Sequence, residues 1–198
     1  MDSLSDDELD SILTIINDSA QYLSTTIDDF RNFFNPKNNN IHKINSIKTI
    51  EKALKLVSSQ FNAKDIELIQ DLESYEFLSI ENELVQVLVN LLNNAKDILI
   101  TKENLRRLIF INTYQKDGTS YIEIKDNGGG VDDSIVDRIF EPYFTTKHQA
   151  QGTGIGLYMS EEIVKNHLNG ILSVENSTYT YDGIEYKGAK FSIKIDAN

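Results

Sequence analysis

The chain has 198 residues, and its 19 Lys and Arg against 31 Asp and Glu give a formal net charge of -12. It has no cysteine, which excludes disulfides, thiolate metal sites and a cysteine nucleophile. An acidic surface repels polyanions, so the composition argues against binding to nucleic acid or anionic lipid. At this length we expect one domain with an appendage, or two small domains.

The N-terminus, MDSLSDDELD, carries five acidic residues and no basic ones, the opposite of a signal peptide. No apolar stretch is long enough to span a bilayer. We therefore expect no membrane segment in this chain and a cytoplasmic location. Whether a longer parent protein is membrane-anchored is left open.

Residues 5–34 predict one long helix. Ser5 and Glu8 form a capping box at its start, and Asn35-Pro36 ends it. Its apolar side chains recur at alternating steps of three and four: Leu9, Leu13, Ile16, Ala20, Leu23, Ile27, Phe30 and Phe34. So apolar a seam needs helical partners in a bundle or coiled coil. They would come from another molecule, from the missing part of a hairpin, or from the surface of the globular domain.

Helices and strands alternate from residue 41 onward. The patterns predict a helix over 45–59, a strand within 60–72, a helix over 83–100, a hairpin over 109–127, a loop-rich stretch over 127–152, a helix from 156 to about 167, and strands over 171–176 and 189–195. Antiparallel hairpins dominate, so the expected fold class is α+β: a two-layer α/β sandwich preceded by one long bundle-type helix. We expect two domains, 1–40 and 41–198.

Six of the ten glycines fall in two clusters. They are Gly128, Gly129 and Gly130 in DNGGGV, and Gly152, Gly154 and Gly156 in GTGIGLYMS. Glycine lets the backbone pass close to a ligand and exposes N–H groups, so the clusters favour phosphate binding, with simple turns as the alternative. A Walker loop is excluded because no Gly-Lys-Ser/Thr is present. A Rossmann site is disfavoured because the glycines do not lie in an early βαβ unit.

The predicted helix over 83–100 carries a line of polar side chains: Gln86, Asn90, Asn94 and Asp97. Mg²⁺ prefers oxygen ligands and keeps several waters, so amide oxygens and one carboxylate can hold it beside phosphates. An ordinary polar face is the alternative. Asp126 follows a predicted strand, where a carboxylate can accept a hydrogen bond from an exocyclic amine of a base; the alternative is a turn-capping role.

Four motifs follow one another along the chain: VLVNLLNNAKD, DNGGGV, IFEPYFTTK and GTGIGLYMS. Together they resemble the N box, the aspartate-glycine box, the F box and the glycine-rich lid hinge of the ATP-binding domain of sensor histidine kinases. That family lies in the wider group with gyrase, the heat-shock chaperone ninety and MutL. NHLNGILSVEN and GAKFSIKI resemble the closing elements of the same domain.

The resemblance implies ATP and Mg²⁺ as cofactors. It implies that Asn94 coordinates Mg²⁺ with Asn90 assisting, that Asp126 reads the adenine amino group, and that Lys147 can reach the terminal phosphate. It also implies a mobile ATP lid over 131–151. The other positions that it assigns to the lid anchor and the cofactor pocket are Gly128, Gly130, Phe140, Phe144, Gly152, Thr153, Gly154, Gly156 and Leu157.

Asn90 separates two kinds of chemistry within this group. In the hydrolysing members and the anti-sigma-factor serine kinases, a Glu stands at this position and acts as a base. Asn cannot do so, whereas a neutral imidazole already presents a lone pair. The resemblance therefore implies transfer of the ATP γ-phosphoryl to a histidine, for relay to a response regulator. The alternatives are a nucleotide-dependent protein-binding module and an ATPase without histidine phosphotransfer.

The N-terminal helix resembles the second helix of the dimerisation and phosphotransfer hairpin, which implies a homodimer in the parent protein. The first hairpin helix, with its phosphoacceptor histidine, is absent. We interpret His42, His148 and His167 as structural or exposed, and expect no autophosphorylation of this chain alone. Asp97 stands where some sensor kinases place a Lys, which leaves open the cation that neutralises the γ-phosphate.

Overall fold

The computed structural model describes residues 40–103, 106–147 and 152–196, and five residues near the N-terminus. Those five, Ile12, Leu13, Ile16, Asn17 and Ala20, are helical. The rest of the predicted helix over 5–34, including most of its seam, lies outside the described residues. The chain forms two compact units, Met1–Lys37 with Arg138–Met159, and Asn38–Asp137 with Ser160–Asn198.

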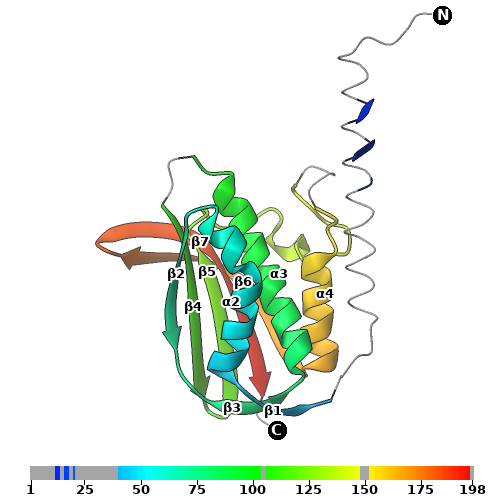
Figure 1. Cartoon of the computed structure of the whole chain (residues 1–198), viewed down its shortest axis with the longest axis vertical. Helices are drawn as coiled ribbons and strands as arrows, with labels where there is room; N and C mark the ends of the chain where they lie inside the picture. Colours follow the sequence, from blue (N-terminus) through cyan, green and yellow to red (C-terminus); the bar gives the residue numbers. More distant parts are fainter. Residues whose placement is uncertain are drawn as a thin grey trace, which may run out of the picture. The chain divides into compact units, whose positions relative to one another are not determined.

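The larger unit contains a five-stranded sheet in the order β2-β4-β5-β7-β6 (Figure 1). Its strands are β2 (Ile66–Leu72), β4 (Arg107–Lys116), β5 (Thr119–Asp126), β6 (Gly170–Tyr181) and β7 (Ile184–Asp196). β2 runs parallel to β4, and the other neighbouring pairs are antiparallel. A separate two-stranded ribbon pairs β1 (His42–Asn45) with β3 (Glu76–Ser79).

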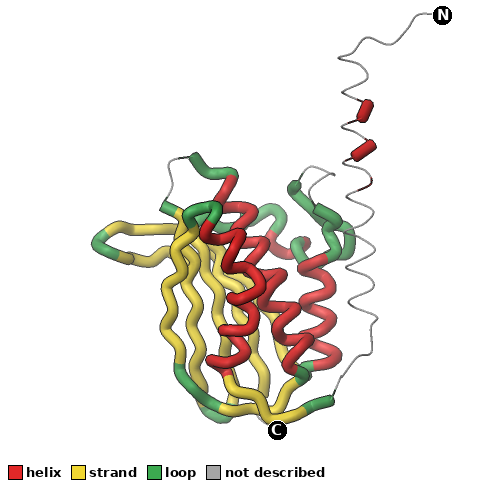
Figure 2. Tube along the Cα trace, viewed as in Figure 1, coloured by secondary structure: helices red, strands yellow, loops and turns green. Residues whose placement is uncertain are grey.

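Two helices, α2 (Ser46–Asn62) and α3 (Glu81–Ile100), lie side by side on one face of this sheet, as Figure 2 shows. Side chains that are 2% exposed or less fill the interface between the two layers; they include Leu84, Leu88, Leu91, Leu92, Leu99, Ile109, Ile111, Ile122 and Ile124. Each such side chain contributes about 1.5–3 kcal/mol by burial. The expected two-layer α/β sandwich is confirmed.

The remaining helical elements of the described residues lie within the loop-rich stretch or directly after it. They are the single 3-10 turn η1 (Val136–Arg138), α4 (Gly156–Glu162) and the π-helical turn η2 (Ile163–His167). The last two together match the helix predicted from 156 to about 167. Among the described helices, none has the length and apolar character needed to cross a membrane.

The end of the helix predicted over 45–59 was placed too early. α2 continues to Asn62 because Phe61 belongs to its apolar face and is 1% exposed. The strand predicted within 60–72 therefore begins only at Ile66. The four-residue strands β1 and β3 were not predicted, since so short a run shows little alternation.

The last two strands are much longer than the predicted 171–176 and 189–195. β6 and β7 continue pairing beyond the end of β5 and close at a turn after Tyr181. Tyr179 and Tyr186 face each other across this extension with ring centroids 6.0 Å apart, and cross-strand aromatic pairs stabilise such hairpins. The polar and glycine residues between the two predicted strands concealed the extension.

Candidate functional site

Asp126 ends β5 and is 3% exposed. Its Oδ1 accepts a hydrogen bond of 2.7 Å from the Gly128 N–H and one of 3.4 Å from the Ala189 N–H. Both bonds go to the same oxygen, so Oδ2 accepts none from the described part of the chain.

Burial raises the pKa of Asp126 to about 6, although the N–H groups of Gly128 and Ala189 act in the opposite direction. The side chain is therefore mostly ionised at neutral pH and close to protonation just below it. A carboxylate in this state can accept a hydrogen bond from a ligand amino group through Oδ2.

Gly188 of β7 passes against the backbone of Asp126. A Cβ placed on Gly188 would lie 1.6 Å from the Asp126 carbonyl oxygen, so no larger residue fits without moving one of the two strands. The sequence analysis did not single out Gly188. The signal was a glycine within a strand-forming segment, which often marks close approach of another backbone.

The first glycine cluster lies against the C-terminal half of α3. A Cβ placed on Gly128 would be 2.8 Å from Ile98 Cγ2. Asn94 lies one turn before Ile98 on the same helix, so the two share a face. The structure thus brings the predicted residues Asp126 and Gly128 to the part of α3 that carries Asn94.

Asn90 is held by a residue that the sequence analysis did not assign. Its Nδ2 donates a hydrogen bond of 2.8 Å to the Oγ of Ser160, a residue that is 2% exposed. This bond engages the amide nitrogen and leaves Oδ1 as an oxygen donor for a cation or a bound water. The only sequence signal for Ser160 was its place as the last residue of GTGIGLYMS.

The polar side chains predicted to form a line on α3 are all half-buried: Gln86, Asn90, Asn94 and Asp97. Asp97 Oδ1 lies 3.5 Å from Lys96 Nζ. Lys96 also donates to the side-chain oxygen of Gln60 on α2, at 2.7 Å. Asp97 therefore has a neighbouring cation from its own helix.

Within the smaller unit, the F-box segment touches the second glycine cluster. A Cβ on Gly152 would lie 2.8 Å from Thr145 Oγ1 and 3.2 Å from Lys147 Cβ, and one on Gly154 would lie 2.4 Å from the Tyr143 carbonyl carbon. The predicted residues Lys147, Gly152 and Gly154 are thus brought together.

The other predicted residues of this unit have local contacts. Thr153 Oγ1 accepts a hydrogen bond of 3.3 Å from the Ile155 N–H, and Gly156 begins α4. Arg138 Cζ lies 4.6 Å from the centroid of the Phe144 ring, a cation–π contact. Phe140 and Leu157 are half-buried. The roles of these residues toward a nucleotide stay predictions.

Two of the three histidines have polar contacts in the structure. His42 is exposed, with Nδ1 2.9 Å from the Asn40 carbonyl oxygen. His167 Nδ1 is 3.0 Å from both carboxylate oxygens of Glu83. These contacts fit the structural interpretation of both side chains. His148 lies outside the described residues.

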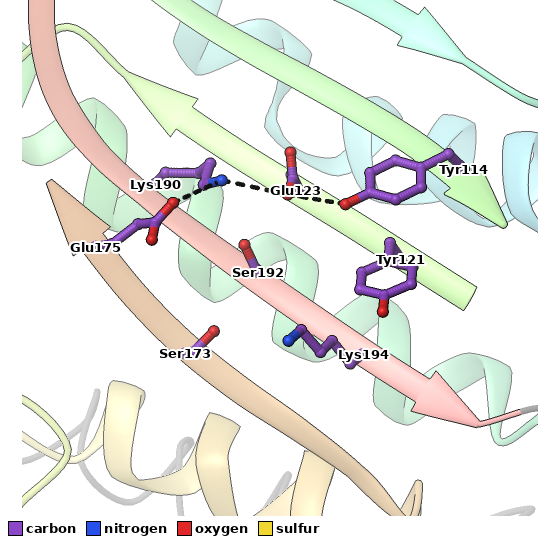
Figure 3. A pocket seen from close by; sticks show the side chains of 8 residues that line it. All are labelled: Tyr114, Tyr121, Glu123, Ser173, Glu175, Lys190, Ser192 and Lys194. Atoms are coloured by element: carbon purple, nitrogen blue, oxygen red, sulfur yellow. Dashed lines mark hydrogen bonds and ion pairs between the residues drawn. The ribbon is translucent and has the colours of Figure 1, made fainter. Parts of the chain in front are cut away.

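A shallow depression of about 210 Å³ lies on the face of the sheet that α2 and α3 leave open (Figure 3). Its lining is polar and consists of Tyr114, Tyr121, Glu123, Ser173, Glu175, Lys190, Ser192 and Lys194. Lys190 Nζ lies 2.7 Å from Glu175 and 3.4 Å from Glu123, which balances the charges locally. None of the residues predicted from the motifs lines this depression.

Comparison with known families supports the motif interpretation. Residues 79–198 match the family described as histidine kinase-, DNA gyrase B-, and HSP90-like ATPase. This segment begins just before α3 and includes Asn90, Asn94, Asp126 and both glycine clusters.

Two relatives illustrate the similarity in sequence. The two-component sensor PprA of Pseudomonas aeruginosa is 40% identical over 117 residues, which are 58% of this chain and 12% of PprA. The signal transduction histidine-protein kinase AtoS of Escherichia coli K12 is 30% identical over 162 residues, 80% of this chain and 26% of AtoS. The chain therefore spans about a quarter of the length of AtoS, and less of PprA.

Two solved structures share the fold. Histidine kinase ThkA in complex with the response regulator protein TrrA has a TM-score of 0.71 at 17% identity, over 99% of this chain and 53% of ThkA. Full-length ShkA in complex with AMPPNP has a TM-score of 0.69 at 20% identity, over 100% of this chain and 41% of ShkA. The sequence relatives named here are a two-component sensor and a signal transduction histidine-protein kinase, and this chain belongs to the histidine kinase-, DNA gyrase B-, and HSP90-like ATPase family.

Proposed function

We propose that this chain is the ATP-binding catalytic portion of a sensor histidine kinase. In the full-length protein it would transfer the γ-phosphoryl group of ATP to a histidine of the dimerisation domain. The observation that carries the proposal is Asp126, a buried carboxylate with one oxygen on backbone N–H groups and the other available to a ligand. The AMPPNP bound to ShkA supports an adenine nucleotide as the ligand.

In this proposal Asp126 Oδ2 accepts a hydrogen bond from the adenine amino group. Gly128 and Gly130 would line the nucleotide site, at positions where a Cβ would crowd Ile98 and Asn176. Asp126 is fixed by backbone N–H groups on both β7 and its own loop. Such a preorganised acceptor selects a base with an amino group over one with a carbonyl at that position.

Asn94 and Asn90 would hold Mg²⁺. Their amide oxygens suit this cation, and the hydrogen bond from Asn90 to Ser160 leaves the Asn90 oxygen for that role. When bound, Mg²⁺ neutralises phosphate charge. Lys147 would contact the terminal phosphate. The remaining positions assigned to the lid and the phosphate pocket are Phe140, Gly152, Thr153, Gly154, Gly156 and Leu157, with residues 131–151 as the ATP lid.

Phosphotransfer would form a bond between an imidazole nitrogen and the γ-phosphorus and break the bond from that phosphorus to the β,γ-bridging oxygen, releasing ADP. A neutral imidazole supplies its own lone pair, so the site needs positioning more than a base. Asn90, which cannot act as a base, is consistent with this acceptor.

Residues 1–40 would be the second helix of the dimerisation hairpin, residues 41–198 the catalytic domain, and the parent protein a homodimer through the completed hairpin. A response regulator would receive the phosphoryl group, as the ThkA complex with TrrA suggests by analogy. The location would be cytoplasmic, with a membrane anchor in the parent left open. This chain alone would not phosphorylate itself on histidine.

The test is phosphotransfer in trans. The chain is incubated with radiolabelled ATP, Mg²⁺ and a separately produced helical hairpin that carries the phosphoacceptor histidine of the parent protein. We expect acid-labile label on the hairpin, none on the chain alone, and none with Asp126→Asn. Nucleotide binding without transfer would favour a binding module instead. Multiple turnovers of ATP without an acceptor would favour an ATPase.

A further inference from the structure

The side-chain amide of Asn176 on β6 forms two hydrogen bonds with the backbone of Val131. Its Oδ1 accepts a hydrogen bond of 2.7 Å from the Val131 N–H, and its Nδ2 donates one of 2.7 Å to the Val131 carbonyl oxygen. One side-chain amide thus does what a neighbouring strand does in an antiparallel pair. The segment between Asp126 and this contact, residues 127–131, is called the glycine loop below.

The other end of the glycine loop is held in the same way. Asn127 is 4% exposed; its Oδ1 accepts a hydrogen bond of 2.9 Å from the Leu108 N–H, and its Nδ2 donates one of 2.6 Å to the Arg106 carbonyl oxygen. Two amide side chains therefore fasten the two ends of a loop whose middle consists of three glycines.

The middle of the glycine loop also depends on the β6–β7 hairpin. The Gly129 N–H donates a hydrogen bond of 2.9 Å to the Lys187 carbonyl oxygen. Gly130 has a φ of +87°, and a Cβ on it would lie 2.3 Å from Asn176 Oδ1. The loop thus adopts a backbone shape that glycine permits, pressed against the side chain that holds it.

The extended part of the hairpin reaches Asp126 as well. The Tyr179 hydroxyl donates a hydrogen bond of 3.0 Å to the Asp126 carbonyl oxygen. Lys125 Nζ lies 3.6 Å from the centroid of the Tyr179 ring, which fixes that ring over β5. The hairpin that carries Asn176 is therefore anchored on the residue proposed to read adenine.

We infer that Asn176 is a positioning residue for nucleotide binding, which holds the glycine loop in the shape that presents Asp126 to the base. The inference rests on the proposed function, since it takes an adenine nucleotide as the ligand of Asp126. Consecutive glycines lose more backbone entropy on ordering than other residues do. A loop that is already ordered by Asn176 spares the ligand that cost and binds it more tightly.

The test compares Asn176→Ala with Thr180→Ala, an exposed position on the same strand. Calorimetry measures the affinity of each protein for AMPPNP and GMPPNP with Mg²⁺. Asn176→Ala removes the two hydrogen bonds to Val131 and a longer one, of 3.3 Å, from Asn176 Nδ2 to Asp133 Oδ1. This loss predicts AMPPNP binding about tenfold weaker, together with a smaller preference for AMPPNP over GMPPNP. A merely structural role would not change that preference. Thr180→Ala should match the wild type in both respects.

If the wild type binds neither nucleotide, the proposed function fails. If the wild type binds and Asn176→Ala keeps both its affinity and its base preference, the inference is overturned while the proposed function stands. A second measurement does not depend on the variant folding. Amide hydrogen exchange in the ligand-free wild type should be slow at Val131 and Gly129, and exchange there as fast as in an exposed turn would overturn the inference.

Discussion

The side-chain nitrogen of Asn90 donates a hydrogen bond of 2.8 Å to the hydroxyl oxygen of Ser160, 70 residues further along the chain. Asn90 lies on α3, and Ser160, which is almost completely buried, lies in α4. Because an amide has one donor end and one acceptor end, engaging the nitrogen decides where the oxygen is presented. Ser160 thus orients the side chain that we propose assists Mg²⁺.

Ser160→Ala should weaken nucleotide binding in a way that depends on Mg²⁺. Without the hydroxyl, the Asn90 amide can rotate and present nitrogen where oxygen is needed, which predicts a loss of about threefold to tenfold. Calorimetry with AMPPNP should show the loss with Mg²⁺ and almost none with a chelator. Ser58→Ala, an exposed serine of α2, is the matched control. An equal loss in both conditions would contradict the role of Ser160 in presenting oxygen.

Asp126→Asn should stabilise the ligand-free protein at neutral pH. An acid whose pKa rises from 3.8 to about 6 on folding binds its proton more tightly in the folded state. Its contribution to stability is therefore most favourable below about pH 4 and is lost as the pH rises through about 6. Removing the charge should gain on the order of 1–3 kcal/mol at pH 7.5, measured by urea denaturation. The gain should shrink at pH 4.5, and a variant less stable at pH 7.5 would refute it.

The affinity for ADP should fall as the pH is lowered through the pKa of Asp126, which burial raises to about 6. Protonation removes the acceptor that the adenine amino group requires. Titration of Asp126 alone should therefore make ADP binding about fourfold weaker at pH 5.5 than at pH 7.5. The phosphates titrate in the same range, and Asp126→Asn reports their effect alone. Identical pH profiles for the two proteins would exclude a titrating role of Asp126 in binding.

Gly188→Ala should destabilise the protein through contact, since its Cβ would lie 1.6 Å from the Asp126 carbonyl oxygen. We expect a loss of about 2–3 kcal/mol, typical of overpacking. Gly183→Ala is the control: this glycine has a φ of +74° and no atom within 4 Å of the added Cβ, so only backbone strain of about 1 kcal/mol is expected. Urea denaturation measures both, and equal losses would argue against close approach at Gly188.

The main elements of the fold could be predicted from the sequence because their patterns are long. α3 has seven buried apolar residues at helical spacing, β5 alternates between half-buried and buried over all eight of its positions, and β4 contains four consecutive buried apolar residues. Short strands such as β1 lack enough positions to show a period. The parallel pairing of β2 with β4 joins distant segments, which no local pattern reveals.

In the candidate site, too, local sequence motifs could be predicted, whereas contacts between distant segments could not. Asp126, Asn90 and Asn94 could be selected because they lie in compact motifs with a chemical rationale. Asn176 and Ser160 could not, because each acts through a contact more than 40 residues away in the chain. The sequence marks the groups that meet a ligand more clearly than the groups that hold them.

The most direct test of the account is a calorimetric titration with AMPPNP, with and without Mg²⁺, of the wild type, Asp126→Asn and Asn94→Ala. We predict one binding site in the wild type, a loss of affinity in Asp126→Asn in both conditions, and a loss in Asn94→Ala only with Mg²⁺. Unchanged binding in Asp126→Asn, or no binding by the wild type, would contradict the central claim that Asp126 reads the adenine of ATP.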